Sequence, residues 1–193
     1  SVSFLWCLVR PAAMSSAAIG EVQVDTLFSA SGIEIITEPY LVGPELGQLA
    51  QQASADFVRT LPILSPPPVV LEILNGGRHY YLSQAFEQVT GTPCLVATLR
   101  AKRGHPDQPE PPAAAAPATD LIKHQPEGSD WFVHLWERPE PEVLLSGPLL
   151  IGDTIATGTT LVGVLDWVVQ QMEDRGAGQD IRVVTICGAA EWS

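Results

Sequence analysis

A turn of small residues follows a short hydrophobic run in the last third of the sequence. The run 148–151 is apolar, Asp153 follows it, and the small residues after that are Ala156, Thr157, Gly158, Thr159 and Thr160. Side chains of this size let backbone N–H groups converge on an anion, and the positive end of a following helix strengthens the attraction. The segment predicts a cradle for a phosphate monoester, with Asp153 placed to accept hydrogen bonds from ribose hydroxyls.

Two common phosphate-binding motifs are absent from this segment. It lacks the Gly-Lys-Ser/Thr ending of a nucleoside-triphosphate P-loop, and it lacks the spaced glycines of a dinucleotide-binding fold. The pattern therefore points away from ATPases and from NAD-dependent enzymes.

The segment Leu149-Leu-Ile-Gly-Asp-Thr-Ile-Ala-Thr-Gly-Thr-Thr160 resembles the motif of the type I phosphoribosyltransferase family. That motif has aliphatic residues, two acids, a short apolar link and Thr-Gly-Gly-Thr/Ser. The resemblance implies binding of 5-phosphoribosyl-1-pyrophosphate (PRPP), with Asp153 on the ribose hydroxyls and Thr157 to Thr160 around the 5'-phosphate. Gly152 replaces the first acid and Thr159 the second loop glycine, so a protein with weakened or lost catalysis stays open.

Two earlier segments occur in the order that the family requires. The turn Asn75, Gly76, Gly77 and Arg78 is similar to the family's pyrophosphate-binding loop, although alone it would read as a simple tight turn. Arg100 and Lys102 stand at the end of the next predicted strand, where the family places basic residues at the start of its catalytic flap. These positions are expected to hold and neutralise the pyrophosphate.

The elements around these motifs alternate between short β-branched runs and amphipathic stretches, which is typical of βα units. The predicted strands are 33–37, 69–74, 93–99, 131–136, 149–151 and 181–187, and the predicted helices are 45–59, about 79–89 and 160–173. We expect an α/β fold with a mostly parallel central sheet flanked by helices, and a long flap between the second and third core strands.

The chain length of 193 residues suits a single domain. We expect a disordered or non-native leader over 1–20, with Met14 as a plausible native start, and one phosphoribosyltransferase-like domain over 21–193. The flap is the Pro-rich stretch at about 101–146, which we expect to return to the sheet edge. The segment 24–40 is the candidate base-recognising hood, and a further hood or strand after Ala190 is expected to be missing through truncation or in a reduced variant.

The composition limits the partners. A formal net charge of -12 disfavours nucleic acid, because counterion release needs a basic surface. Cys7, Cys94 and Cys187 lack metal-ligand spacing and are expected to be buried thiols in a reducing compartment. No signal or membrane span is recognisable, so we expect no membrane partner and a cytoplasmic protein.

The expected reaction displaces pyrophosphate from C1' of PRPP by a ring nitrogen of a nucleobase, through a transition state with oxocarbenium character. The resemblance implies Mg²⁺ held mainly by PRPP oxygens, with Asp153 as the candidate protein ligand, and a purine-type base. Family members are commonly dimers, so a homodimer is expected. The alternative is a regulatory protein that senses PRPP or a nucleotide without catalysis; a different sugar-phosphate enzyme is a weaker third reading.

Overall fold

The computed structural model describes residues 2–6, 15–19, 22–27, 29–38, 40–74, 77–104, 122–125, 131–153, 159–178 and 180–185. Within these residues, one sheet has the strand order β2-β3-β1-β9-β8-β4-β5-β7-β6. The strands are β1 (Val2–Trp6), β2 (Ser15–Ile19), β3 (Val22–Thr26), β4 (Val69–Leu74), β5 (Leu95–Gly104), β6 (Ile122–His124), β7 (Phe132–Trp136), β8 (Leu149–Gly152) and β9 (Ile181–Val184).

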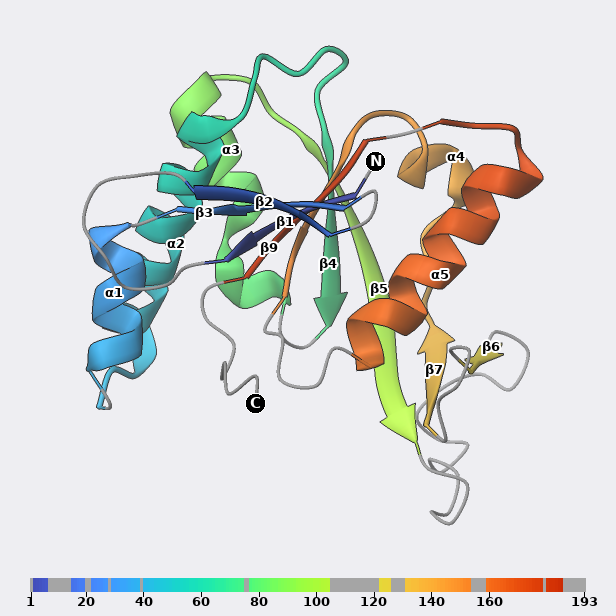
Figure 1. Cartoon of the computed structure of the whole chain (residues 1–193), viewed down its shortest axis with the longest axis horizontal. Helices are drawn as coiled ribbons and strands as arrows, with labels where there is room; N and C mark the ends of the chain where they lie inside the picture. The colour runs from blue at the N-terminus through green and yellow to red at the C-terminus, as the bar shows by residue number, and fades with distance from the viewer. Residues whose placement is uncertain are drawn as a thin grey trace.

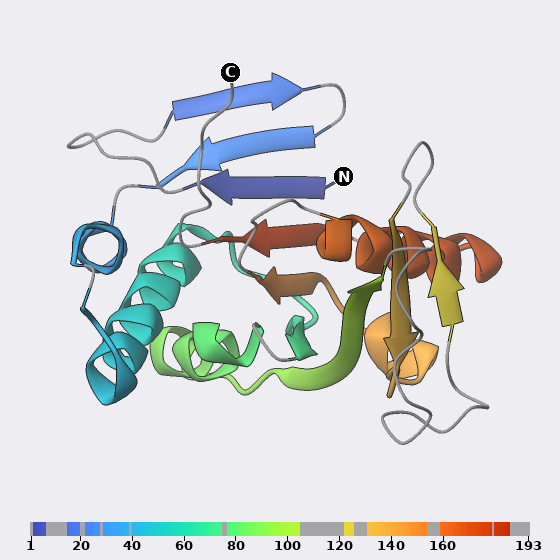
Figure 2. The ribbon, with the colours of Figure 1, turned by 90° about the horizontal axis from the view of Figure 1, so that it is seen from below.

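The helices of the described residues pack on both faces of this sheet (Figures 1 and 2). They are α1 (Ala30–Thr37), α2 (Gly43–Thr60), the 3-10 helix η1 (Gly77–Tyr80), α3 (Leu82–Thr90), α4 (Pro141–Leu144) and α5 (Thr159–Asp174). The interior strands β3, β1, β9, β8, β4 and β5 are all parallel, whereas β2, β7 and β6 add antiparallel edges. The predicted α/β class with a mostly parallel sheet is confirmed.

Side-chain alternation along the central strands separates two hydrophobic cores. Val69, Leu71 and Ile73 of β4 pack in the core that includes α4 and α5, whereas Val70 packs in the core that includes α2 and α3. A strand buried on both faces reads as a continuous apolar run, and this explains why 69–74 was predictable as a central strand.

The order of the strands reverses between β4 and β8. From β4 the chain continues to its neighbour β5, and it later returns to β8 on the other side of β4 before reaching β9. In Figure 1 the heads of β4 and β5 point to the lower edge of the molecule, and α5 begins at that edge. In open α/β sheets, ligands bind beyond the carboxyl ends of the strands at such a reversal.

The structure corrects the predicted strand over 33–37, which lies within helix α1. The Ser29 side chain caps this helix by accepting a hydrogen bond from the Gly32 N–H at 3.4 Å, and its Oγ donates to Asp56 of α2. The cap and the packing on α2 outweigh the strand preference of the isoleucines.

Two short strands lie within the stretch 1–20, for which the sequence predicted a disordered or non-native leader. Val2–Trp6 forms β1 between β9 and β3, and Ser15–Ile19 forms β2 at the sheet edge. An apolar, strand-prone run beside β9 extends the ladder, because an uncovered strand edge leaves its backbone groups unpaired.

The described part of the segment 101–146 lies at the edge of the sheet. β7 pairs antiparallel with the second half of β5, and β6 pairs antiparallel with β7. Residues 105–121 and 126–130, which hold most of the Pro-rich stretch, lie outside the described residues. The pairing with β7 carries β5 on to Gly104, so this strand ends later than predicted.

Candidate functional site

Asp153 lies directly after β8, at the carboxyl edge of the sheet. Leu149, Leu150 and Ile151 of β8 are 0% exposed, which fixes the strand in the centre of the molecule. The Asp153 N–H continues the ladder by donating to the Val184 carbonyl at 3.2 Å. The carboxylate is therefore carried by a rigid strand end, beyond which the sequence predicts the phosphate cradle.

The turn that follows β4 packs directly against the end of β8. A Cβ atom added to Gly77 would lie 2.9 Å from the Gly152 carbonyl oxygen and 3.3 Å from Cα of Glu72. Only a residue without a side chain allows this approach. The structure thus brings the predicted pyrophosphate turn, through Gly77, against the strand that carries Asp153; Asn75 and Gly76 lie outside the described residues.

Tyr80 joins the same two segments and was missed in the sequence. It is 4% exposed, and its hydroxyl donates to the Asp153 backbone carbonyl at 2.6 Å. A Cβ atom added to Gly152 would lie 2.8 Å from both Cβ and Cγ of Tyr80. The ring accordingly fills the space that a side chain at position 152 would need. No spacing signal pointed to this contact.

Helix α5 begins at Thr159, directly after the predicted phosphate turn. Thr159 and Thr160 are partly buried in its first turn, and a helix of 16 residues has the positive end of its dipole there. Thr159 thus lies in the helix rather than before it, one residue earlier than the predicted helix start. Ala156, Thr157 and Gly158 lie outside the described residues.

Thr185 is a second residue that the sequence did not single out. It follows β9, beside the backbone of Asp153, and is 3% exposed. Its Oγ1 has no hydrogen-bond partner within the part of the chain that the structure describes. A buried hydroxyl without a partner is costly, so Thr185 is a candidate contact for a ligand that binds at the carboxyl edge.

The three cations predicted to bind pyrophosphate lie on two elements, η1 and β5. Arg78 is exposed on η1, and Arg100 lies opposite Leu74, the last residue of β4. The Arg100 Nε atom lies 2.5 Å from Glu137 Oε2, with the side chains 42% and 50% exposed. Lys102 is exposed further along β5. Arg100 and Lys102 thus lie in the last part of β5, where this strand pairs with β7.

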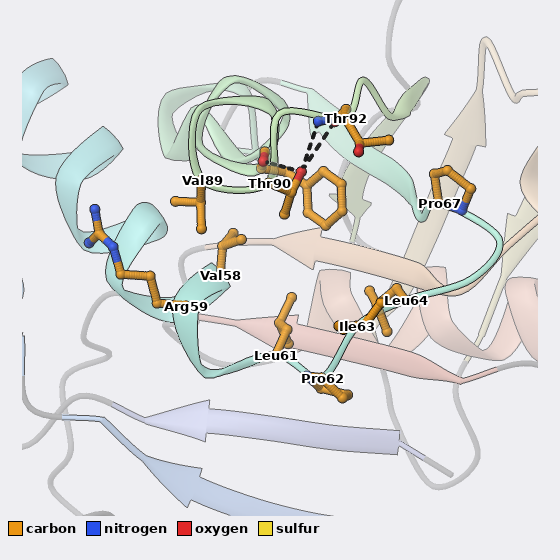
Figure 3. A pocket seen from close by; sticks show the side chains of 11 residues that line it. Val58, Arg59, Leu61, Pro62, Ile63, Leu64, Pro67, Val89, Thr90 and Thr92 are labelled. Carbon is orange, nitrogen blue, oxygen red and sulfur yellow. Dashed lines mark hydrogen bonds between the residues drawn. The ribbon is translucent and has the colours of Figure 1, made fainter.

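A pocket of about 500 Å³ lies at the opposite edge, between the ends of α2 and α3 and the loop that leads into β4 (Figure 3). Its lining is mostly apolar and includes Val58, Leu61 and Phe86. The Thr90 hydroxyl in this lining donates to the Phe86 carbonyl at 2.8 Å and accepts from the Thr92 N–H at 3.1 Å. This hydroxyl is satisfied internally, so it does not identify a ligand for the pocket.

The described residues contain no group of three or more His, Cys, Asp and Glu side chains that could hold a metal ion. Within the same residues, every helix is too short or too polar to cross a bilayer.

Comparisons with known proteins add a distant similarity. No protein-family model matches the sequence, and no curated protein matches it. A solved hypoxanthine phosphoribosyltransferase from Staphylococcus aureus is similar in structure, with a TM-score of 0.44 and 15% sequence identity, over 72% of this chain and 61% of that one. The chain thus spans less than two thirds of that enzyme's length. A TM-score of this size does not bear on activity.

Proposed function

We propose that this chain binds PRPP at the carboxyl edge of the sheet and transfers its phosphoribosyl group to a nucleobase, with release of pyrophosphate. One observation carries the proposal. The two segments that resemble the family's loops follow the adjacent strands β4 and β8, and they meet where the strand order reverses, through the contacts of Gly77 and Tyr80 with Gly152 and Asp153.

The residues divide between the two ends of the substrate. Asp153 accepts hydrogen bonds from the ribose hydroxyls, and the 5'-phosphate binds at the start of α5, among Ala156, Thr157, Gly158, Thr159 and Thr160. The pyrophosphate binds at Asn75, Gly76, Gly77 and Arg78, with Arg100 and Lys102 neutralising its charge as it leaves. A carboxylate accepts hydrogen bonds from hydroxyl groups, and arginine and lysine side chains bind phosphate groups well.

The chemistry requires positioning and electrostatic stabilisation, without a covalent nucleophile. Arg100 can contact the departing pyrophosphate only if its ion pair with Glu137 breaks. Because both side chains are about half exposed, breaking this ion pair costs about 1 kcal/mol or less. Replacement of Glu137 by the pyrophosphate group at Arg100 would couple neutralisation of the leaving group to substrate binding.

The residues present fit a Mg²⁺ ion that arrives with the substrate. Mg²⁺ in phosphate-handling proteins commonly binds one or two carboxylates together with substrate oxygens, and Asp153 is the carboxylate at this edge. When bound, the ion neutralises negative charge on the pyrophosphate oxygens. We further propose a purine base, a homodimer and a cytoplasmic location.

Gly152 favours a second candidate function, a protein that senses PRPP or a nucleotide without turning it over. The Tyr80 ring occupies the place of a side chain at this position, so the chain presents one carboxylate where the family motif has two. Such a site would keep the phosphate contacts and lose a contact to the ribose or to Mg²⁺.

Pyrophosphate release separates the two functions. The full chain is incubated with PRPP, Mg²⁺ and, in turn, adenine, hypoxanthine, guanine, uracil and orotate. Base-dependent release supports the transferase, whereas thermal stabilisation by PRPP without release supports the sensor. If no combination of ligands gave pyrophosphate release or thermal stabilisation, both functions would be refuted.

A further inference from the structure

Tyr80 connects three parts of the fold at the candidate site. Its backbone carbonyl accepts a hydrogen bond from Ser54 Oγ of α2 at 2.5 Å, and its hydroxyl donates to the Asp153 carbonyl at 2.6 Å. Ser54 is 0% exposed and Tyr80 is 4% exposed. A buried residue that is hydrogen-bonded through both its backbone carbonyl and its side-chain hydroxyl has little freedom, so it connects the end of β8 to α2.

The Asp153 carbonyl belongs to the peptide that leads from β8 into the predicted phosphate turn. The hydrogen bond from Tyr80 spans 73 positions of sequence, and its length is within the normal range for an O–H donor to oxygen. Fixing this carbonyl fixes the direction in which the chain leaves the strand. The direction of that exit constrains the backbone that carries the Asp153 side chain.

We propose that Tyr80 is a positioning residue of the ribose-phosphate site, an inference that rests on the proposed function. The hydroxyl orients the chain at Asp153, and the ring reserves the space beside Gly152. Tyr80 does not need to touch the ligand to act in this way. Because the ring and a side chain at position 152 exclude one another, the same residue also limits the motif to a single carboxylate.

The test compares two Tyr→Phe variants of neighbouring residues. Tyr80→Phe removes the hydroxyl that holds Asp153 and keeps the ring, whereas Tyr81→Phe is the matched control one position away. Binding of ribose 5-phosphate and of PRPP with Mg²⁺ is measured by calorimetry, at a temperature where all proteins are folded. We expect Tyr80→Phe to bind both ligands about fivefold more weakly and Tyr81→Phe to bind as the unchanged chain does.

A purely structural role would lower the melting temperature without changing affinity in the folded protein. Affinities of Tyr80→Phe equal to those of Tyr81→Phe would therefore overturn the inference and leave the proposed function standing. If the unchanged chain bound neither ligand, the proposed function would fail, and this inference with it.

A second measurement covers the case in which Tyr80→Phe does not fold. Ser54→Ala frees the Tyr80 backbone carbonyl and leaves the ring in place, so we expect a weaker version of the same affinity loss. Hydrogen exchange at the Asp153 amide follows the same change without any ligand. Unchanged affinity together with unchanged exchange in Ser54→Ala would count against Tyr80 as the positioning residue.

Discussion

Replacing Gly152 by alanine tests the contact on which the site geometry depends. The added Cβ would lie 2.8 Å from Cβ and Cγ of Tyr80 and 3.1 Å from its Cδ1, closer than such contacts occur in proteins. Tyr80 cannot easily move away, because Ser54 and the Asp153 carbonyl hold it and the surrounding core is buried. Either the ring shifts and loses the bond to Asp153, or β8 moves away from η1.

Overpacking of this kind costs about 1–3 kcal/mol of unfolding free energy. For a chain of this size, each kcal/mol lowers the melting temperature by about 2–4 °C, so we expect a decrease of about 2–12 °C. Because a displaced Tyr80 also releases Asp153, ribose 5-phosphate should bind more weakly in the same variant.

Gly178→Ala is the matched control, since nothing lies within 4 Å of a Cβ atom added there and its φ is not in the left-handed region. Surface changes of this type alter stability by about 0.5 kcal/mol or less. Urea unfolding of both variants gives the two free energies directly. A Gly152→Ala variant as stable as Gly178→Ala would refute the packing of Tyr80 against β8.

Three further predictions follow from the described residues. Asp153→Asn should lower PRPP affinity or turnover at least about tenfold, and unchanged binding by calorimetry would remove Asp153 from the site. Thr185→Val, which replaces the buried hydroxyl by a methyl group, should weaken ribose 5-phosphate binding about fivefold at unchanged or higher stability; unchanged binding would exclude the hydroxyl as a ligand contact. Burial raises the pKa of the Cys94 thiol, the nearby Glu87 adds to the increase, and a backbone hydrogen bond opposes it. Iodoacetamide should then label Cys94 more slowly at pH 8 than it labels an unfolded peptide of the same sequence. The folded state holds the thiol proton more tightly than the unfolded state does. The resulting contribution to folding stability is complete below the ordinary thiol pKa and is lost as pH rises through the raised pKa of the folded state. Cys94→Ala should abolish this dependence of stability on pH.

Much of the framework was predictable because it depends on neighbouring residues. The mostly apolar runs at 69–74 and 149–151 favoured buried strands, and the 45–59 pattern, with Pro44 in the first turn, favoured an amphipathic helix. The small residues after Asp153 likewise indicated a turn ahead of a helix, and α5 begins there. These features follow from side-chain size and periodicity within a dozen residues.

The remaining features depend on contacts between distant parts of the chain. The isoleucines of 33–37 favour a strand locally, yet the cap from Ser29 and the packing on α2 make them helical. The strand predicted to end at 99 continues as β5 to Gly104, because its second half pairs with β7. The sequence shows only that Gly152 stands where the motif has an acid, whereas the structure shows that the Tyr80 ring fills the space beside it. Spacing along the sequence carries no information on which residues share that space, since two segments more than seventy positions apart meet only once the sheet has formed.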